Sequence, residues 1–215
     1  MRGWSGGFEK LRRRVPALAA EAKATGSPLK LRANIVLMHQ TVAAFPALCE
    51  ELASWGITEL TFNQLGGRDR PEFYPAHRLT LADVRTLEAQ LPLLRIRLAA
   101  NSTTLIGGDK YLDRIRASAM DEPNPVEDCS PGESFLFIDG RGRIAPCSFT
   151  NEDYAVSIDE ITSALDIATL PFRFQQLRQT RRSNQCNDCL STQVCDKFMP
   201  PPTSRQAAYG LAAAE

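Results

Sequence analysis

The residues of this chain that are best suited to chemistry are its cysteines. Five of the six lie between positions 129 and 195, and Cys49 stands apart from them. Their spacing reads Cys129-x12-Gly142-x4-Cys147 and then, after a gap, Cys186-x2-Cys189-x5-Cys195. Two thiolates separated by two residues can reach one metal centre from a single tight turn, as they do in zinc and iron–sulfur sites. Cys129 and Cys147 would complete a set of four thiolates.

The cysteine spacing by itself leaves the identity of the metal open. A structural zinc site with four cysteines and a [4Fe–4S] cluster fit it equally well. A disulfide framework is less expected, because thiols stay reduced in the cytoplasm, where we place this protein. Five cysteines cannot ligate two complete four-thiolate clusters. At most one cluster is therefore fully held by cysteine, and Cys195 remains as a spare or alternative ligand.

The overall composition is that of an ordinary globular protein. The 25 basic residues balance the 25 acidic ones, so the chain has no general attraction to nucleic acids or to anionic membranes. No apolar run approaches the ~20 residues of a membrane helix, and the first ten residues lack the apolar core of a signal peptide. We expect a cytoplasmic protein whose partners are neither nucleic acids nor membranes.

The N-terminal half predicts alternating helices and strands in an α/β fold. The expected helices cover residues 8–24, 45–55 and 80–91, and the expected strands cover residues 31–38, 59–65 and 94–98. Pro16 is expected to kink or interrupt the first helix. In the third strand Arg95 and Arg97 alternate with apolar residues, as in a half-exposed or edge strand. This order predicts parallel strands with right-handed crossovers. Three strands cannot close a barrel, so we interpret this half as part of a larger structure.

A change in composition predicts a second, smaller α+β domain over residues 108–199, after a first domain over residues 1–107. Within the second domain, residues 135–138 and 143–147 flank the turn Asp139-Gly140-Arg141-Gly142, which is a hairpin signature. A helix is expected over residues 171–182, ahead of the Cys-x2-Cys pair. Residues 200–215 are rich in Pro and then Ala, which predicts a flexible tail.

The cysteine pattern resembles that of the SPASM/twitch accessory domains of radical-SAM proteins. Their motif places a cysteine and a spacer before Gly-x4-Cys, then a gap and Cys-x2-Cys-x5-Cys-x3-Cys. All five clustered cysteines fit in register, and the next expected cysteine falls on Met199. The twitch form, which binds one auxiliary [4Fe–4S] cluster, is therefore the more similar. The resemblance implies Cys129, Cys147, Cys186 and Cys189 as its ligands and favours iron–sulfur over zinc.

The N-terminal half resembles the C-terminal part of a radical-SAM partial (β/α)6 barrel. Residues 29–66 are similar to the fourth and fifth strands with the helix between them, and residues 94–101 are similar to the sixth strand. The Cys-x3-Cys-x2-Cys motif that holds the catalytic cluster of the family is absent from this sequence. The resemblance therefore leaves three alternatives: the chain is a fragment, a partner chain supplies the missing barrel half, or the radical chemistry has been lost. S-adenosyl-L-methionine (SAM) is expected as a cofactor only if the missing half is supplied.

In the family, side chains of the fourth and fifth strands contact SAM, and the polar residues within the corresponding strands here are Asn34 and Asn63, alongside Thr61. Polar side chains in an otherwise apolar strand suit a barrel lumen. The alternative is that both face solvent or satisfy backbone groups. His39 follows the first strand at its carboxyl end, where the sites of βα barrels lie, although a lone loop histidine is more often incidental.

Two functional hypotheses follow. The first is a radical-SAM/SPASM-type protein whose auxiliary cluster takes part in electron transfer or substrate binding during modification of a peptide or small molecule. The second is a non-catalytic module that binds zinc or a cluster and acts with a partner protein. Because the motif for SAM cleavage is absent, whether the chain is itself an enzyme stays open.

Overall fold

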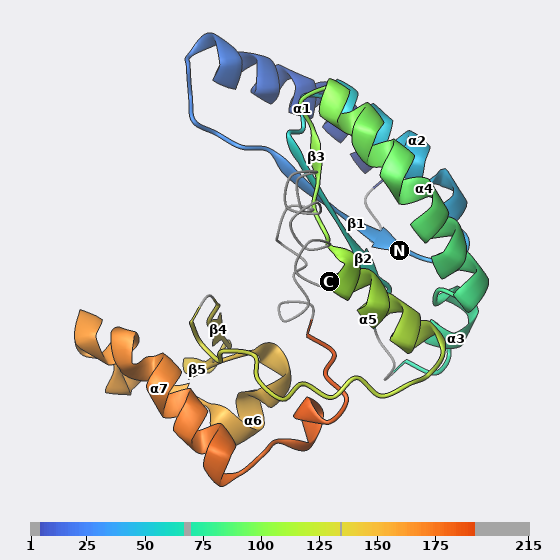
Figure 1. Cartoon of the computed structure of the whole chain (residues 1–215). Coiled ribbons are helices and arrows are strands. Elements are labelled where there is room, and N and C mark those ends of the chain that lie inside the picture. The colour runs from blue at the N-terminus through green and yellow to red at the C-terminus, as the bar shows by residue number, and fades with distance from the viewer. Residues whose placement is uncertain (1–4, 67–69, 134, 192–215) are drawn as a thin grey trace, which may run out of the picture. The chain divides into compact units, whose positions relative to one another are not determined.

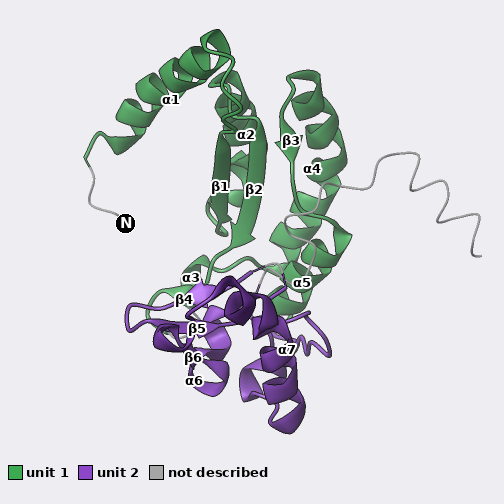
Figure 2. Ribbon diagram, turned by 90° about the vertical axis from the view of Figure 1, so that its left-hand side faces the viewer, with its two compact units in different colours: residues 1–120, 196–215 green, residues 121–195 purple. Residues whose placement is uncertain are grey.

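The computed structural model describes residues 5–66, 70–133 and 135–191. The chain is mixed α/β, with two three-stranded sheets (Figure 1). It divides into two compact units, and the first gives way to the second between Met120 and Asp121 (Figure 2). The composition predicts this boundary earlier, after residue 107, and the tail expected over residues 200–215 lies outside the described residues. Among the described helices, none has the length and apolar character that crossing a bilayer requires.

Unit 1 (residues 5–120 of the described chain) alternates helices with short strands. Its elements are α1 (Gly7–Ala24), β1 (Arg32–Leu37), α2 (Phe45–Ser54), β2 (Glu59–Gln64), α3 (Tyr74–His77), α4 (Leu81–Ala100), β3 (Thr104–Leu105) and α5 (Asp109–Ala119). The first two predicted strands and the first two predicted helices are confirmed within one or two residues. Pro16 does not interrupt α1, which runs continuously through it.

The sheet of unit 1 is parallel throughout, as the strand–helix–strand order predicts. The strand order is β1-β2-β3, and the register pairs Asn34 with Thr61 and Glu59 with Thr104. Helices α2 and α4 lie on one side of it (Figure 1). On that side Phe62 packs its ring against Phe45 of α2, with ring centroids 5.6 Å apart. The carboxyl ends of the strands therefore meet at one edge, where ligands bind in open α/β sheets.

The prediction of a strand over residues 94–98, compared above with the sixth barrel strand over residues 94–101, is wrong. Helix α4 continues through this segment to Ala100. Leu94 and Leu98 are fully buried and extend the apolar stripe of the same helix, whereas Ile96 is 69% exposed. A five-residue segment in which apolar and polar residues alternate is compatible with a strand and with one face of a helix. Here the segment continues the helix that precedes it. The third strand is the two-residue β3.

The two arginines of this segment are consequently helix residues and not edge-strand charges. Arg97 reaches α2 and forms an ion pair with Glu50 at 2.8 Å between Nε and Oε1. Arg95 donates a hydrogen bond to the carbonyl oxygen of Gly107, just before α5. Both side chains therefore connect α4 to its neighbours in unit 1.

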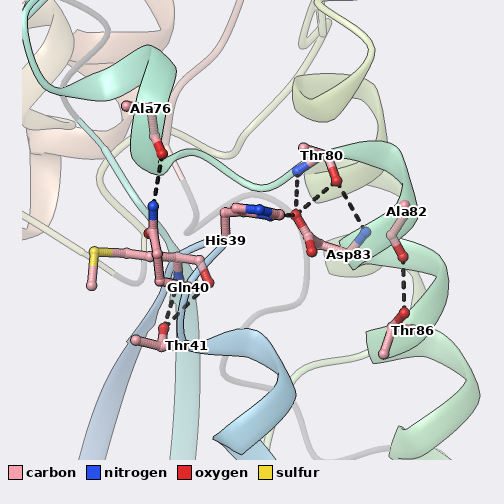
Figure 3. Close-up of polar contacts among 9 residues, drawn as sticks. His39, Gln40, Thr41, Ala76, Thr80, Ala82, Asp83 and Thr86 are labelled. Atoms are coloured by element: carbon pink, nitrogen blue, oxygen red, sulfur yellow. Dashed lines mark hydrogen bonds and ion pairs between the residues drawn. The ribbon is translucent and has the colours of Figure 1, made fainter.

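The carboxyl end of β1 is attached to the start of α4 through Asp83 (Figure 3). The Asp83 carboxylate accepts hydrogen bonds from the backbone N–H and the hydroxyl of Thr80, at 2.8 and 2.7 Å. It also lies 2.8 Å from Nδ1 of His39, which follows β1. Thr80 caps α4 in return by accepting from the backbone N–H of Asp83. One carboxylate thus closes a capping box and holds the loop after β1.

Unit 2 (residues 121–191 of the described chain) builds a small core on a second sheet. Its elements are β4 (Phe137–Ile138), β5 (Arg143–Ala145), α6 (Asn151–Tyr154), β6 (Val156–Ser157) and α7 (Ala164–Thr180). The predicted hairpin is confirmed, since β4 and β5 pair antiparallel. The long helix begins at Ala164, before the predicted start at 171, because Ser163 and Asp166 form a capping box there. Pro171 is therefore inside the helix.

Replacing Asp83 by alanine is expected to destabilise unit 1 by about 1–2 kcal/mol, because the variant loses the helix cap and the contact with His39. Urea unfolding followed by circular dichroism measures the change. Asp113→Ala is the matched control, since Asp113 is an exposed carboxylate paired with Arg116 on a helix surface, and it should cost less than ~0.5 kcal/mol.

The contribution of Asp83 to the free energy of unfolding also depends on pH. Burial alone would raise the pKa of Asp83, but hydrogen bonds from Thr80 and His39 outweigh it and hold this pKa below its usual value. A carboxyl group whose pKa is lowered by folding stabilises the fold above its unfolded pKa and loses that contribution as the pH falls through its folded pKa. The stability difference between the wild type and Asp83→Ala should therefore shrink in acid. A difference independent of pH would contradict the assignment.

Candidate metal centre

Four cysteines of unit 2 line one pocket, although the chain brings them from three separate segments. They are Cys129, Cys147, Cys186 and Cys189, and we refer to their pocket as the cysteine pocket. It encloses about 60 Å³. Its remaining wall is largely apolar and includes Phe135 and Phe149. Cys195, the alternative ligand, lies outside the described residues. The four residues that the spacing singles out are thus neighbours in space.

Cys147 reaches the pocket from the hairpin. It follows β5 by two residues and precedes the 3-10 turn Ser148–Thr150. Its sulfur lies 3.1 Å from the hydroxyl oxygen of the buried Thr150. The turn of the hairpin favours Gly142, because its φ of 73° lies in the left-handed region and a Cβ there would approach Cγ2 of Ile158 to 3.0 Å, closer than an ordinary contact. The backbone conformation of the turn therefore explains why the cysteine pattern has a glycine at position 142.

Cys186 and Cys189 come from a tight turn after α7. Cys186 ends the 3-10 turn Asn184–Cys186, which Ser183 caps. The Tyr154 hydroxyl accepts a hydrogen bond from the buried backbone N–H of Ser183 at 2.6 Å, and it donates to the carbonyl oxygen of Arg181 at 2.9 Å. The Tyr154 hydroxyl therefore fixes the backbone at both Arg181 and Ser183, directly after the end of α7. Cys186 itself is buried in the core of unit 2.

A short run of backbone hydrogen bonds connects this turn to the segment that leads to Cys129. The N–H of Val126 donates to the carbonyl oxygen of Cys186 at 3.1 Å, and the N–H of Cys189 donates to the carbonyl oxygen of Asn124 at 2.9 Å. The segment before Cys129 is thus paired with the segment that carries the Cys-x2-Cys pair. Three of the four thiols are held by this pairing.

Arg178 of α7 fixes the position of Cys129. Its side chain is 9% exposed and donates to the carbonyl oxygens of Val126 and Glu127 and, at 2.9 Å, to the Cys129 sulfur. Arg182, one turn later, donates to the carbonyl oxygens of Val126 and Cys186 but to no sulfur in the described chain. A guanidinium with several fixed donors suits such a role.

The electrostatics of the pocket oppose a lone thiolate on Cys129. Burial raises the pKa of the Cys129 thiol; the Arg178 guanidinium acts in the opposite direction, and the three neighbouring cysteines raise the pKa further. Thiolates crowded in this way need added positive charge, which a bound metal supplies as the protons leave. Cys129, Cys147 and Cys186 form no disulfide, so these three thiols are available.

A zinc ion and an iron–sulfur cluster require different spacings of the four sulfurs. Among the residues that the structure describes, no three His, Cys, Asp or Glu side chains are close enough to hold a single metal ion. A single zinc ion with four cysteines requires Zn–S distances of about 2.3 Å, which bring the sulfurs within roughly 4 Å of one another. In a [4Fe–4S] cluster each thiolate binds a different iron, so the sulfurs lie further apart.

Asn34 and Asn63 belong to unit 1 and therefore lie in a different unit from the cysteine pocket. They lie on the face of the sheet opposite Phe62. The Asn34 Oδ1 accepts from the Thr61 hydroxyl at 2.9 Å and from Asn63 Nδ2 at 3.1 Å. The Asn63 Oδ1 accepts from the Tyr111 hydroxyl at 3.1 Å. The two amides thus belong to one polar network along β1, β2 and α5.

The cysteine spacing does not reveal the polar residues that position the thiols. Arg178, Tyr154 and Thr150 all act through contacts distant in sequence or through buried hydroxyls. The available signal for Arg178 is its place on the apolar stripe of α7, one turn after the fully buried Phe174. A charged residue on such a stripe indicates a buried polar partner.

Comparisons with known proteins give no match for this chain: no protein-family model, no curated protein and no solved structure corresponds to it. The chemical argument therefore rests on the residues and their geometry.

Removing the Tyr154 hydroxyl is expected to destabilise unit 2. In Tyr154→Phe the buried N–H of Ser183 loses its acceptor, which should cost about 1–3 kcal/mol. Hydrogen exchange of the amides around Ser183, measured by mass spectrometry, should become faster. Tyr74→Phe is the matched control, because the Tyr74 hydroxyl bonds to none of the described residues; unchanged exchange in Tyr154→Phe would contradict the role given to this phenol.

Proposed function

We propose that this chain binds one [4Fe–4S] cluster in the cysteine pocket and acts as a radical-SAM/SPASM-type protein of the twitch kind. The ligands in this proposal are Cys129, Cys147, Cys186 and Cys189. The observation that carries it is that four cysteines from three segments line a single pocket of unit 2. The cluster would serve electron transfer or substrate binding during modification of a peptide or small molecule.

The resemblance of the cysteine pattern to the twitch motif favours a cluster over a single zinc ion. Four thiols that line one cavity fit a centre in which each sulfur binds its own iron. The lining of the pocket is largely apolar, and an apolar surrounding limits the access of solvent to a bound centre. Arg178 and Thr150 place a guanidinium and a hydroxyl beside two of the sulfurs, and such hydrogen bonds tune the potential of an iron–sulfur centre.

Unit 1 supports the barrel part of the proposal by its topology. Three parallel strands with helices on one face and a polar network on the other are the arrangement of a βα-barrel segment, in which polar residues of the inner face line the lumen. SAM contacts from Asn34 and Asn63 belong to this proposal. They would also need the barrel half that carries a Cys-x3-Cys-x2-Cys motif, which is not among these 215 residues.

When bound, an auxiliary iron–sulfur cluster accepts or donates one electron at a time. The residues of this chain would hold and insulate it. Cys129 would be oriented by Arg178, Cys147 by the hairpin, and the Cys-x2-Cys pair by the turn that Tyr154 fixes. Phe135 and Phe149 would separate the pocket from water.

The metal content of the protein tests the proposal. Protein purified without oxygen should be brown and contain about four irons and four sulfides per chain. Cys147→Ala should lose most of both, because one iron then lacks its ligand. Cys49→Ala is the matched control: burial raises the pKa of Cys49 to about 12, so this core thiol stays protonated and its removal should leave the iron content unchanged.

One zinc per chain without sulfide would overturn the cluster and support the second hypothesis, a structural zinc module that acts with a partner protein. Loss of iron from Cys49→Ala as large as from Cys147→Ala would contradict the assignment of the ligands. Iron content that is unchanged in both variants would do the same.

Arg178→Met is expected to lower the reduction potential of the bound cluster. The positive charge of Arg178 and its hydrogen bond to the Cys129 sulfur stabilise the reduced cluster, which carries one more negative charge than the oxidised cluster. The variant loses both interactions. A redox titration followed by electron paramagnetic resonance measures the midpoint. Arg182→Met is the control, because it removes the same charge one turn away without touching a sulfur. An equal shift of the midpoint potential in both variants would contradict a specific effect of the Arg178 hydrogen bond on the cluster.

A further inference from the structure

Two adjoining cavities of unit 2 form a groove along one face of α7, which we call the α7 groove. The cavities have volumes of about 280 and 310 Å³, and Asp128, Pro131 and Gln175 line both of them. On the helix the groove extends from Ala168 to Arg182, a length of about 21 Å at the rise of an α-helix. An extended peptide of about six residues spans that length.

The first cavity carries negative charge that no residue of the described chain neutralises. Asp128 and Glu133 line it and are exposed, and neither forms an ion pair with a described residue. No lysine or arginine of the described chain lines this cavity. Arg173 of the same helix lies outside it and is paired with Glu160 at 2.8 Å. The two carboxylates therefore attract a cation that belongs to another molecule.

An exposed aromatic ring lines the same cavity. Phe172 is 64% exposed, and Ala168 and Pro171 extend its apolar wall. The aliphatic stem of a lysine or arginine packs against such a ring while its charged end reaches nearby carboxylates. The same carboxylates repel phosphate groups. The first cavity thus fits a cationic side chain and disfavours nucleic acids and anionic lipids.

The second cavity offers groups that suit a peptide backbone. The side-chain amides of Gln175 and Gln179 are exposed there and have no hydrogen-bond partner among the described residues. An amide side chain both donates and accepts hydrogen bonds, as it must to pair with the backbone of an extended peptide. Arg182 lies at the far end of this cavity. The charge therefore changes from negative to positive along the groove, which gives a bound peptide a preferred direction.

We infer that the α7 groove binds an extended peptide segment, with a lysine or arginine side chain in the first cavity and the adjacent backbone in the second. Ser130 and Pro131 line both the first cavity and the cysteine pocket, so the peptide lies against the loop that carries Cys129. That this peptide is the substrate of a modification rests on the proposed function. The binding itself does not need the cluster.

Fluorescence anisotropy of labelled peptides with the full chain tests the inference. The probe is a peptide of about eight residues in which lysine and alanine alternate, long enough to span the groove. The comparison peptide has glutamate in place of lysine. We expect the lysine peptide to bind about tenfold more tightly than the glutamate peptide, and its affinity should fall as salt is added.

The carboxylates of the first cavity are tested by Asp128→Asn combined with Glu133→Gln. Asparagine keeps the acceptor for the backbone N–H of Ser130, which Asp128 now binds at 2.9 Å. Binding of the lysine peptide should weaken about fivefold, as expected for the loss of two exposed ion pairs. Glu122→Gln combined with Asp159→Asn is the matched control, because it removes two exposed carboxylates that line neither cavity. It should leave the affinity nearly unchanged.

The apolar wall is tested by Phe172→Ser, which should weaken binding of the lysine peptide about threefold. Leu165→Ser is its control, because Leu165 is 70% exposed on the same helix and lines neither cavity. Equal affinity for the lysine and glutamate peptides, or equal weakening in the groove variants and their controls, would overturn the inference. A dimer of the wild type that Phe172→Ser dissociates would also overturn it, since a second copy would then occupy the groove.

Iron analysis of the same samples separates this inference from the proposed function. Protein without iron that binds the lysine peptide with the expected dependence on Asp128 and Glu133 would support the groove and contradict the cluster. Protein that contains the cluster but does not distinguish the two peptides would contradict the groove and leave the cluster standing.

Discussion

The hydrogen bonds of Arg178 are the contacts on which the candidate metal centre depends. This side chain extends from α7 to the carbonyl oxygens of Val126 and Glu127 and to the sulfur of Cys129. Helix α7 is itself held in the core by Leu170 and Phe174. Helix α7 therefore holds in place the loop around Cys129, which has no regular secondary structure. In this loop the Arg178 side chain satisfies backbone carbonyl groups that a neighbouring strand would satisfy in a sheet.

The two units use their sheets differently. In unit 1 the sheet is parallel, helices cover one face, and the opposite face carries amides and hydroxyls bonded to one another. In unit 2 the antiparallel hairpin and α7 enclose a small apolar core, and the polar groups are displaced to the pocket that the cysteines line. In unit 1 the polar side chains thus gather on the sheet face opposite helices α2 and α4, and in unit 2 they gather where several segments of the described chain meet.

The sequence allowed good predictions wherever a pattern is local. Strands β1 and β2, helices α1 and α2 and the hairpin follow from periodicity and turn residues within a few positions of one another. The segment over residues 94–98 was mispredicted because Leu94 and Leu98 fit both periods, and the competition was decided by the continuing helix. The neighbourhood of the four cysteines could be anticipated from a motif, whereas the contacts of Arg178 could not, because about fifty residues separate the partners.

The small size of unit 2 suggests that its folding is coupled to metal binding. It spans residues 121–195, and its described core contains six buried side chains, one of which is Cys186. Domains this small bury a modest share of their surface and commonly rely on a metal or on disulfides for stability. A centre held by Cys186 would join the core directly to the hairpin and to the loop of Cys129. The free energy of binding would then stabilise the fold that creates the pocket.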